Sequence, residues 1–433
     1  RVNEMVVLLN TDTGLVNGTS FARPGYRASA STIDFNGDGR LDVMVLANPR
    51  ALTKNSFFYG TYQVNRVGLG EVPIRTSYAD VGTETDKAGS GLAPGKTQAT
   101  VLSALGDVNG DGELDWVSYG ISLGQSYGTS TYLLSSGVGV WRAQKQPLPA
   151  QYNDGSVAWA DLNGDGVLDA LVSSYLGADF APNSTVASIN LRVLLSSSDQ
   201  GGYTLNGNYQ VSTALQPGAV LADINGDGRF DVVGSGGETL LGQAGGGFRQ
   251  QSMGLKVAPA GNISPIVADL NADGNLDLLY YDANGKVILV LGDSTGQYVG
   301  NNVAATLGLD GPSESGLAYV RAGVVADLNN DRALDFETTS RVGSGVFFNT
   351  ATVAENSYLQ VVVTNDHGGL NAYGAMVSLY DHVSGALVAT RAASGPSGNA
   401  QSSVATSYGA YFFNLDPAKS YDVVVVYPGS DKQ

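Results

Sequence analysis

The chain has 433 residues, a net charge of −17 and no cysteine. The lack of cysteine excludes disulfides, thiolate metal sites and thiol nucleophiles, and without a basic cluster we expect no nucleic-acid partner. No apolar run approaches the ~20 residues that cross a bilayer, so we expect no membrane span. Hydrophobic residues make up 43% of the chain, and 58 glycines indicate many tight turns. This composition favours a folded, all-β protein.

One unit recurs along the chain from about residue 28 to residue 350. A short apolar run is followed by the nine-residue pattern D-x-N-x-D-G-x-x-D, a second β-rich run, a third run and a Gly-rich turn. The runs lack a 3.6-residue period, which predicts strands. Copies lie roughly 60 residues apart, which is room for four short strands and is typical of propeller blades. The pattern starts at Asp34, Asp107, Asp161, Asp223, Asp269 and Asp327.

Each copy of the pattern places oxygen donors at alternate positions, and calcium prefers such ligands. Positions 1, 5 and 9 are Asp and position 3 is Asn, whereas position 7 varies so freely that its backbone carbonyl is the consistent donor. Gly at position 6 in five copies predicts a turn with positive φ, and a large apolar residue at position 8 predicts an anchor in a core. We therefore expect up to six Ca²⁺ ions, one in each loop. The predicted ligands are Asp34, Asn36, Asp38, Arg40, Asp42, Asp107, Asn109, Asp111, Glu113, Asp115, Asp161, Asn163, Asp165, Val167, Asp169, Asp223, Asn225, Asp227, Arg229, Asp231, Asp269, Asn271, Asp273, Asn275, Asp277, Asp327, Asn329, Asp331, Ala333 and Asp335.

Two other interpretations of the pattern are weaker. An EF-hand shares its opening but needs a bidentate Glu at position 12 and flanking helices, and position 12 is not acidic in any copy. Loops that were merely Asn- and Asp-rich turns would leave three carboxylates in each loop without compensation. Six divalent cations would instead cancel twelve of the seventeen net negative charges. We interpret each cation as a staple between strands, with no catalytic role.

The sixth copy, residues 327–335, departs from the pattern with Asn330 at position 4 and Arg332 at position 6. A non-glycine residue in a left-handed turn costs about 1 kcal/mol, and the charge of Arg332 opposes a nearby cation. We predict that this loop binds calcium most weakly.

The chain is expected to contain two domains. Residues 1–350 are the predicted propeller, 351–356 a linker, and 357–433 a small antiparallel β-sandwich without the Asp pattern. Six copies favour six blades, with seven as the alternative. The last unit has three predicted strands, and we expect the N-terminal strand Met5–Leu9 to add the fourth and close the ring within one chain. Donation of this strand to a neighbouring chain would instead allow self-association by strand exchange.

The repeated loops between strands resemble the FG-GAP or VCBS repeats of integrin α-subunit propellers and of many secreted bacterial proteins. The resemblance covers about residues 1–350 and implies calcium in each loop between the first two strands of a blade. The C-terminal part resembles the ASPIC/UnbV domain in three stretches. These are NSYLQVVV at 356–363, NAYGA at 371–375 and NLDPAKSYDVVVVYPG at 414–429.

Three functions fit the sequence. We favour an extracellular adhesion or recognition module that binds a glycan or a protein through propeller loops, because this role is common in the family that the chain resembles. The segments 47–100 and 121–155 are the favoured binding surface, since long loops tend to carry function. A self-assembling surface or filament protein is the alternative.

The predicted location is extracellular or at the cell surface, with the periplasm as an alternative, because loops without a bidentate Glu fit weak sites that fill near millimolar calcium.

An enzyme, such as a polysaccharide lyase or hydrolase, is the least favoured function. The two histidines, His367 and His382, both lie in the C-terminal part, so a Ser-His-Asp arrangement is excluded from the propeller. No catalytic and no organic-cofactor residues are therefore assigned.

Overall fold

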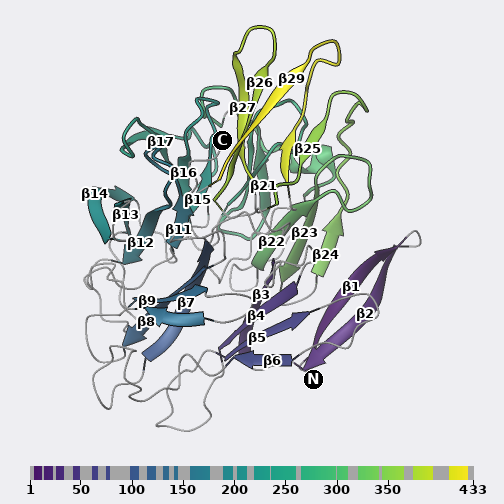
Figure 1. Ribbon diagram of the computed structural model, residues 1–433. Helices are drawn as coiled ribbons and strands as arrows, with labels where there is room; N and C mark the ends of the chain where they lie inside the picture. The colour runs from purple at the N-terminus through teal and green to yellow at the C-terminus, as the bar shows by residue number, and fades with distance from the viewer. Residues whose placement is uncertain are drawn as a thin grey trace.

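The structure is a computed structural model of the chain (Figure 1). Before residue 157 it describes the backbone of separate strands, and from residue 157 it describes longer stretches with most of their side chains. The described ranges are 4–11, 14–22, 26–33, 42–48, 61–66, 75–78, 98–106, 115–122, 130–135, 141–144, 157–175, 189–197, 202–211, 219–234, 236–259, 265–298, 300–310, 320–340, 344–364, 374–393 and 409–427.

The described chain is an all-β fold of antiparallel sheets, with one short 3-10 helix, η1 (Ala304–Leu307), in the described ranges. Six sheets follow one another from residue 26 to residue 347, and within each sheet the strands pair in the order of the sequence. The first two four-stranded sheets are β3 (Tyr26–Ile33), β4 (Asp42–Asn48), β5 (Thr61–Arg66) and β6 (Arg75–Tyr78), then β7 (Gln98–Gly106), β8 (Asp115–Ser122), β9 (Ser130–Ser135) and β10 (Trp141–Gln144). The third and fourth are β11 (Val157–Ala160), β12 (Asp169–Tyr175), β13 (Ile189–Ser197) and β14 (Gly202–Val211), then β15 (Ala219–Ala222), β16 (Asp231–Gly234), β17 (Glu238–Gly242) and β18 (Phe248–Ser252).

The fifth and sixth sheets each have three described strands. They are β19 (Ile266–Ala268), β20 (Asp277–Tyr281) and β21 (Val287–Val290), then β22 (Val320–Ala326), β23 (Asp335–Ser340) and β24 (Ser344–Phe347). In the fifth sheet an isolated bridge between Gly292 and Tyr298 continues the meander beyond β21. Each of these six sheets is called a blade below.

The blades are arranged around a line of first strands. In the described chain β7 contacts β11, β11 contacts β15, β15 contacts β19, and β19 contacts β22. The remaining strands of each blade lie progressively farther from this line, so the sheets radiate as in a repeat β-propeller (Figure 1).

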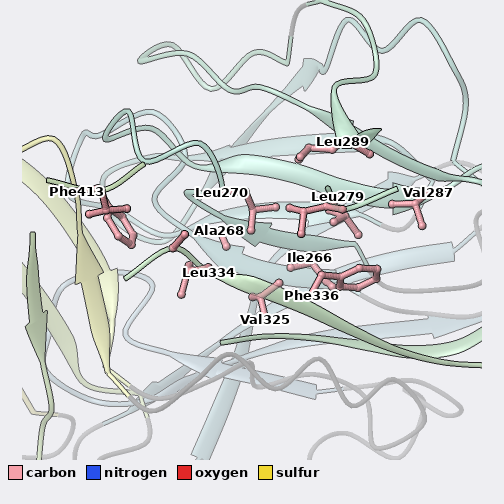
Figure 2. Close-up of a cluster of buried hydrophobic side chains, with 14 of the residues drawn as sticks. Ile266, Ala268, Leu270, Leu279, Val287, Leu289, Val325, Leu334, Phe336 and Phe413 are labelled. Carbon is pink, nitrogen blue, oxygen red and sulfur yellow. The ribbon is translucent and has the colours of Figure 1, made fainter. Parts of the chain in front are cut away.

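Both faces of the fifth blade are buried, because it packs between the fourth and sixth blades. In β20, Leu278 and Tyr280 belong to a cluster shared with the fourth blade, whereas Leu279 and Tyr281 belong to a cluster shared with the sixth. Figure 2 shows the second cluster, in which Leu279 of the fifth blade lies near Phe336 of the sixth. Burying such a side chain stabilises the fold by about 1.5–3 kcal/mol. Two buried faces explain why the strand runs are continuously apolar.

The N-terminal strand does not complete the last blade. β1 (Glu4–Thr11) pairs with β2 (Gly14–Ala22) in a separate two-stranded sheet, and β24 has no further partner among the described strands. The expected pairing of Met5–Leu9 with the last blade is therefore wrong. The hairpin partner was overlooked because Asn, Gly, Thr and Ser separate the apolar residues of the run at 14–22.

The long segments after the first two Asp loops also differ from the expectation. Residues 47–100 contain β5 and β6, and residues 121–155 contain β9 and β10. These strands are the outer half of the first two blades, so the segments are not simply exposed loops. The rest of both segments lies outside the described residues.

The C-terminal part forms two small antiparallel sheets. One pairs β25 (Leu359–Val361) with β28 (Ala410–Phe412), and the other has the order β27 (Leu387–Ala392), β26 (Met376–Asp381), β29 (Tyr421–Val426). Both sheets contribute to one hydrophobic cluster, with Phe412 from the first and Val377 and Leu379 from the second. Within the described chain no helix has the length and apolar character needed to cross a membrane.

Candidate metal-binding loops

Every Asp loop connects the first and second strands of its blade, as the resemblance implied. The residue before position 1 pairs with the Asp at position 9 in all six blades, so the loop is a hairpin connection of constant register. The pairs are Ile33–Asp42, Gly106–Asp115, Ala160–Asp169, Ala222–Asp231, Ala268–Asp277 and Ala326–Asp335. The interiors of loops one and two, residues 34–41 and 107–114, lie outside the described residues, as do the ligands predicted there.

The Asp at position 9 is completely buried in each described loop and is called the base carboxylate. In loop four, Asp231 accepts the Ile224 N–H at 3.0 Å and the Gly242 N–H at 2.7 Å. The first bond closes the loop onto its own position 2, and the second ties the loop to the end of the third strand. The same two bonds recur at Asp169, Asp277 and Asp335. The base carboxylates are Asp169, Asp231, Asp277 and Asp335, each 0% exposed.

The Asp at position 5, called the rim carboxylate, is half-buried or exposed, and its side chain bonds within its own loop. In loop five, Asp273 Oδ1 accepts the Asn275 N–H at 2.8 Å, and Asp273 Oδ2 accepts the Asn271 Nδ2–H at 2.8 Å. The rim N–H in turn donates to Asp269 Oδ1 and Asn271 Oδ1, both at 3.1 Å. Side chains 1, 3 and 5 are therefore held on one turn. The rim carboxylates are Asp165, Asp227, Asp273 and Asp331.

The turn needs two residues with positive φ, and the sequence analysis identified only one of them. Position 6 was expected to be left-handed and is confirmed, with Gly274 at φ +97°. Position 4 is also left-handed, with Ala272 at +60° and Asn330 at +62°. The available signal was Gly at position 4 in four of the six copies, because glycine is the residue that adopts this region without cost.

Positions 2 and 8 anchor each loop between blades. Leu270 at position 2 of loop five and Leu334 at position 8 of loop six belong to the same buried cluster (Figure 2). Ile224 and Leu276 share a cluster in the same way one blade earlier, and the expected anchor at position 8 is confirmed. The buried Asn349 links the same two loops, because its Nδ2 donates to the Leu270 and Leu334 carbonyls at 2.7 and 3.0 Å.

The loop carboxylates lie close to one another, and several of them are buried. Burial raises the pKa of Asp231 and Asp277 to about 7, although backbone N–H groups lower it, and neighbouring loop carboxylates add to the rise. Burial also raises the pKa of Asp269 to about 7. A bound cation would favour the ionised form of each of these groups.

The donor set of a loop fits a hard cation, although no metal-type cluster is formed by acidic side chains alone. In the described residues, no three His, Cys, Asp or Glu side chains stand together in an arrangement that holds a metal. The predicted set also uses the amide oxygen of position 3 and the carbonyl of position 7, which are oxygen donors that calcium accepts. An ionised carboxylate has about four lone-pair sites, so the two N–H bonds of a base carboxylate leave sites for a cation.

The sixth loop keeps the common backbone despite its unusual residues. Arg332 at position 6 has φ +78°, close to the value of +84° at Gly228. Its guanidinium lies 3.5 Å from Glu355, in the segment that was predicted as the linker. Weak calcium binding by this loop stays a prediction, and its basis is the backbone strain together with the nearby charge.

Two further groups have clear positions. Trp159, which lies just before loop three, is 3% exposed. His382 Nδ1 bonds to Asp422 at 2.9 Å on the exposed outer side of the C-terminal sheet. His367 lies outside the described residues.

Comparison with known families matches residues 107–172 to the FG-GAP-like repeat. The matched segment runs from position 1 of loop two through loop three into β12. No curated protein matches the chain.

Several solved structures are similar to the chain at low identity. Rhamnogalacturonan lyase YesW is 14% identical over 95% of this chain and 77% of its own, with a TM-score of 0.42. Exotype rhamnogalacturonan lyase YesX is 15% identical over 81% and 61%, with a TM-score of 0.41. The V. cholerae biofilm matrix protein Bap1 is 15% identical over 79% and 63%, with a TM-score of 0.34. The chain thus spans less than two thirds of YesX and Bap1. In this chain, the pairing of strands in sequence order and the contacts between first strands support a repeat β-propeller.

Proposed function

We propose that this chain is an extracellular, calcium-binding recognition module whose Asp loops are metal-stapled hairpins. The observation that carries the proposal is the common geometry of the described loops. Each holds an Asp, an Asn and a second Asp on one turn, above a buried Asp that fixes the turn to its blade. Burial raises the pKa of Asp231 and Asp269 to about 7, and bound divalent cations would favour the ionised form of these carboxylates.

The proposed recognition role is assigned to the segments that lie outside the repeated Asp loops. The loop residues engage their own blades, so a ligand is expected to contact other surfaces, including the connections within 47–100 and 121–155. The FG-GAP-like match at 107–172 supports a propeller repeat of the kind used for recognition. The ligand class that we propose is a glycan or a protein. We retain the ASPIC/UnbV resemblance of residues 357–433 as part of this proposal.

Calcium titration of the purified chain tests the metal part. Isothermal calorimetry is expected to show several sites. Calcium is expected to raise the free energy of unfolding by RT ln(1 + [Ca²⁺]/Kd) per site, which is measured as a higher unfolding temperature. Heat and stability that do not change between EDTA and millimolar calcium would contradict the metal part. A glycan array and a cell-surface protein screen, each run in calcium and in EDTA, then test the recognition part.

Strand exchange is the second candidate function, and one observation favours it. The outer edge of β24 is unpaired among the described strands, and the adjoining Phe348 is 55% exposed. An unpaired edge beside an exposed aromatic ring is a template for another strand. Light scattering and electron microscopy check this idea. A monomer at all concentrations, unaffected by Val346→Pro at the edge, would exclude assembly through β24.

A further inference from the structure

The C-terminal sheets contact the propeller directly at the Asp loops. Phe413, which follows β28, is 3% exposed and belongs to the cluster formed by Leu270 and Leu334 of loops five and six. Figure 2 shows Phe413 entering this cluster from the C-terminal strands. Leu387 at the start of β27 lies against Gly228 of loop four. The C-terminal sheets therefore contact loops four, five and six.

Two polar side chains of the C-terminal part bond to the turn of loop five. Arg391 Nη2 donates to the Gly274 carbonyl at 3.0 Å, and Asn414 Nδ2 donates to the Asp273 carbonyl at 2.8 Å. These carbonyls belong to positions 6 and 5, whereas the predicted cation ligand is the carbonyl of position 7. These two hydrogen bonds therefore hold the turn in place and leave the expected ligand carbonyl of position 7 free.

Arg391 places a positive charge beside two loops at once. Its guanidinium lies 5.8 Å from the centroid of Phe412, and Nη1 donates to the Thr390 carbonyl at 3.0 Å. Its Nε is buried without a hydrogen-bond partner. Burial lowers the pKa of Arg391, and the carboxylates of Asp269 and Asp223 oppose this change. These carboxylates occupy position 1 of loops five and four, where a cation ligand is expected.

We propose that Arg391 is an internal cation that competes with calcium for the negative charge of loops four and five. Docking of the C-terminal sheets and calcium binding in these two loops then oppose each other. This inference rests on the proposed calcium binding and adds a regulatory contact to it. Loop three is the internal reference, because its described hydrogen bonds stay within the third blade.

Charge decides the direction of the coupling. Without calcium, three carboxylates in each loop attract the guanidinium. A bound Ca²⁺ cancels two of these charges, so the attraction remains but weakens. The uncharged contacts of Asn414 and Phe413 do not change with the charge of the loop. Calcium is therefore expected to loosen the docked sheets, and loss of the Arg391 charge is expected to strengthen calcium binding.

Calorimetric calcium titration of the full chain and of Arg391→Gln tests the proposal. The variant is expected to bind calcium roughly fivefold more tightly at two of its sites, at low ionic strength. Arg249→Gln is the matched control, because Arg249 lies on the exposed face of β18 and its described bond is to Gln251. It removes the same net charge and is expected to leave the affinity unchanged. Arg391→Lys keeps the charge and is expected to behave like the wild type.

Unchanged or weaker calcium binding in a folded Arg391→Gln would overturn the proposal, and so would equal tightening in Arg249→Gln or in Arg391→Lys. Hydrogen exchange of the wild type gives a second measurement that needs no variant. Amides of 387–392 and 409–414 are expected to exchange faster in calcium than in EDTA, and equal or slower exchange would overturn the proposal. A wild type that binds no calcium would instead contradict the proposed function.

Discussion

In loop five, Asp273 and Asp277 lie four residues apart and would pass for equivalent ligands, yet their surroundings differ. Asp277 is 0% exposed, and its two oxygens accept N–H groups from position 2 and from the end of the third strand. Asp273 is half-buried, and its carboxylate bonds only to residues of its own loop in the described contacts. The base carboxylate thus belongs to the architecture of the blade, whereas the rim carboxylate belongs to the turn.

This difference separates two contributions to stability. Buried N–H groups that lose their acceptor cost about 1–3 kcal/mol each, with or without metal. A carboxylate that bonds only within its own loop gains stability from a cation only when the cation is present. The base and the rim of one motif therefore predict different dependence on calcium.

The largest effect is expected from Asp277→Asn. The amide oxygen replaces one acceptor, but the NH₂ group then faces the N–H of Leu270 or Gly292. We expect a loss of about 2–3 kcal/mol in the free energy of unfolding, most of it already present in EDTA. Urea unfolding measures it. A loss that appears only in calcium would mean that the base carboxylate acts mainly as a ligand.

A smaller effect that depends on calcium is expected from Asp273→Asn in the same loop. The amide keeps an oxygen for the Asn275 N–H, so the loss in EDTA should stay below about 1 kcal/mol. The stabilisation by calcium should fall because a charged ligand is lost. Thermal unfolding across a calcium series distinguishes the two variants. Equal behaviour of Asp273→Asn and Asp277→Asn would erase the distinction between rim and base.

The sixth loop sharpens the account of the turn. Arg332 holds φ +78° where most copies have Gly, and this strain costs about 1 kcal/mol. Arg332→Gly is expected to stabilise the fold by up to about 1 kcal/mol, less the exposed pair with Glu355, and to strengthen calcium binding at this loop. Glu355→Gln is the control, since it removes the pair and keeps the strain. No gain in stability or affinity would show that the turn carries no strain.

The smallest effect concerns Asp381, a hydrogen-bonded Asp outside the loops. Its pKa lies well below the ordinary range, because the Ser384 N–H, the Lys419 ammonium and the Ser384 hydroxyl all donate to it. Its folded-state pKa is depressed, so its stabilisation is present above the unfolded value of 3.8 and is lost as pH falls below it. Unfolding temperatures between pH 5 and pH 2 should fall less steeply in Asp381→Asn than in the wild type. Parallel curves would contradict this assignment.

The sequence predicted the repeat and the place of each loop, because local patterns determine both. The apolar runs on either side of the loops that begin at Asp223 and Asp269 are short. Each pair of runs is separated by an Asp loop of fixed length, so the sequence predicts two strands joined as a hairpin. The separate roles of Asp273 and Asp277 were not predictable, because both are Asp and only the register of the two strands buries one of them.

Contacts between distant segments could not be predicted from the sequence, for a different reason. Arg391 reaches Gly274 across 117 residues, and nothing in the surroundings of either residue marks the pairing. The hairpin partner of Met5–Leu9 was missed because polar residues in 14–22 hide a strand. The second left-handed position, at Ala272 and Asn330, was within reach, since glycines fill it in the other copies.

The constant register at the loop ends makes the nine residues an exchangeable cassette. A loop removed between Ala222 and Asp231 and grafted between Ala268 and Asp277 would enter the same strand pairing. Its turn would need no adjustment, and only its residues at positions 2 and 8 would meet new neighbours. Duplication of a whole blade therefore lengthens the array of blades without a new solution for the turn.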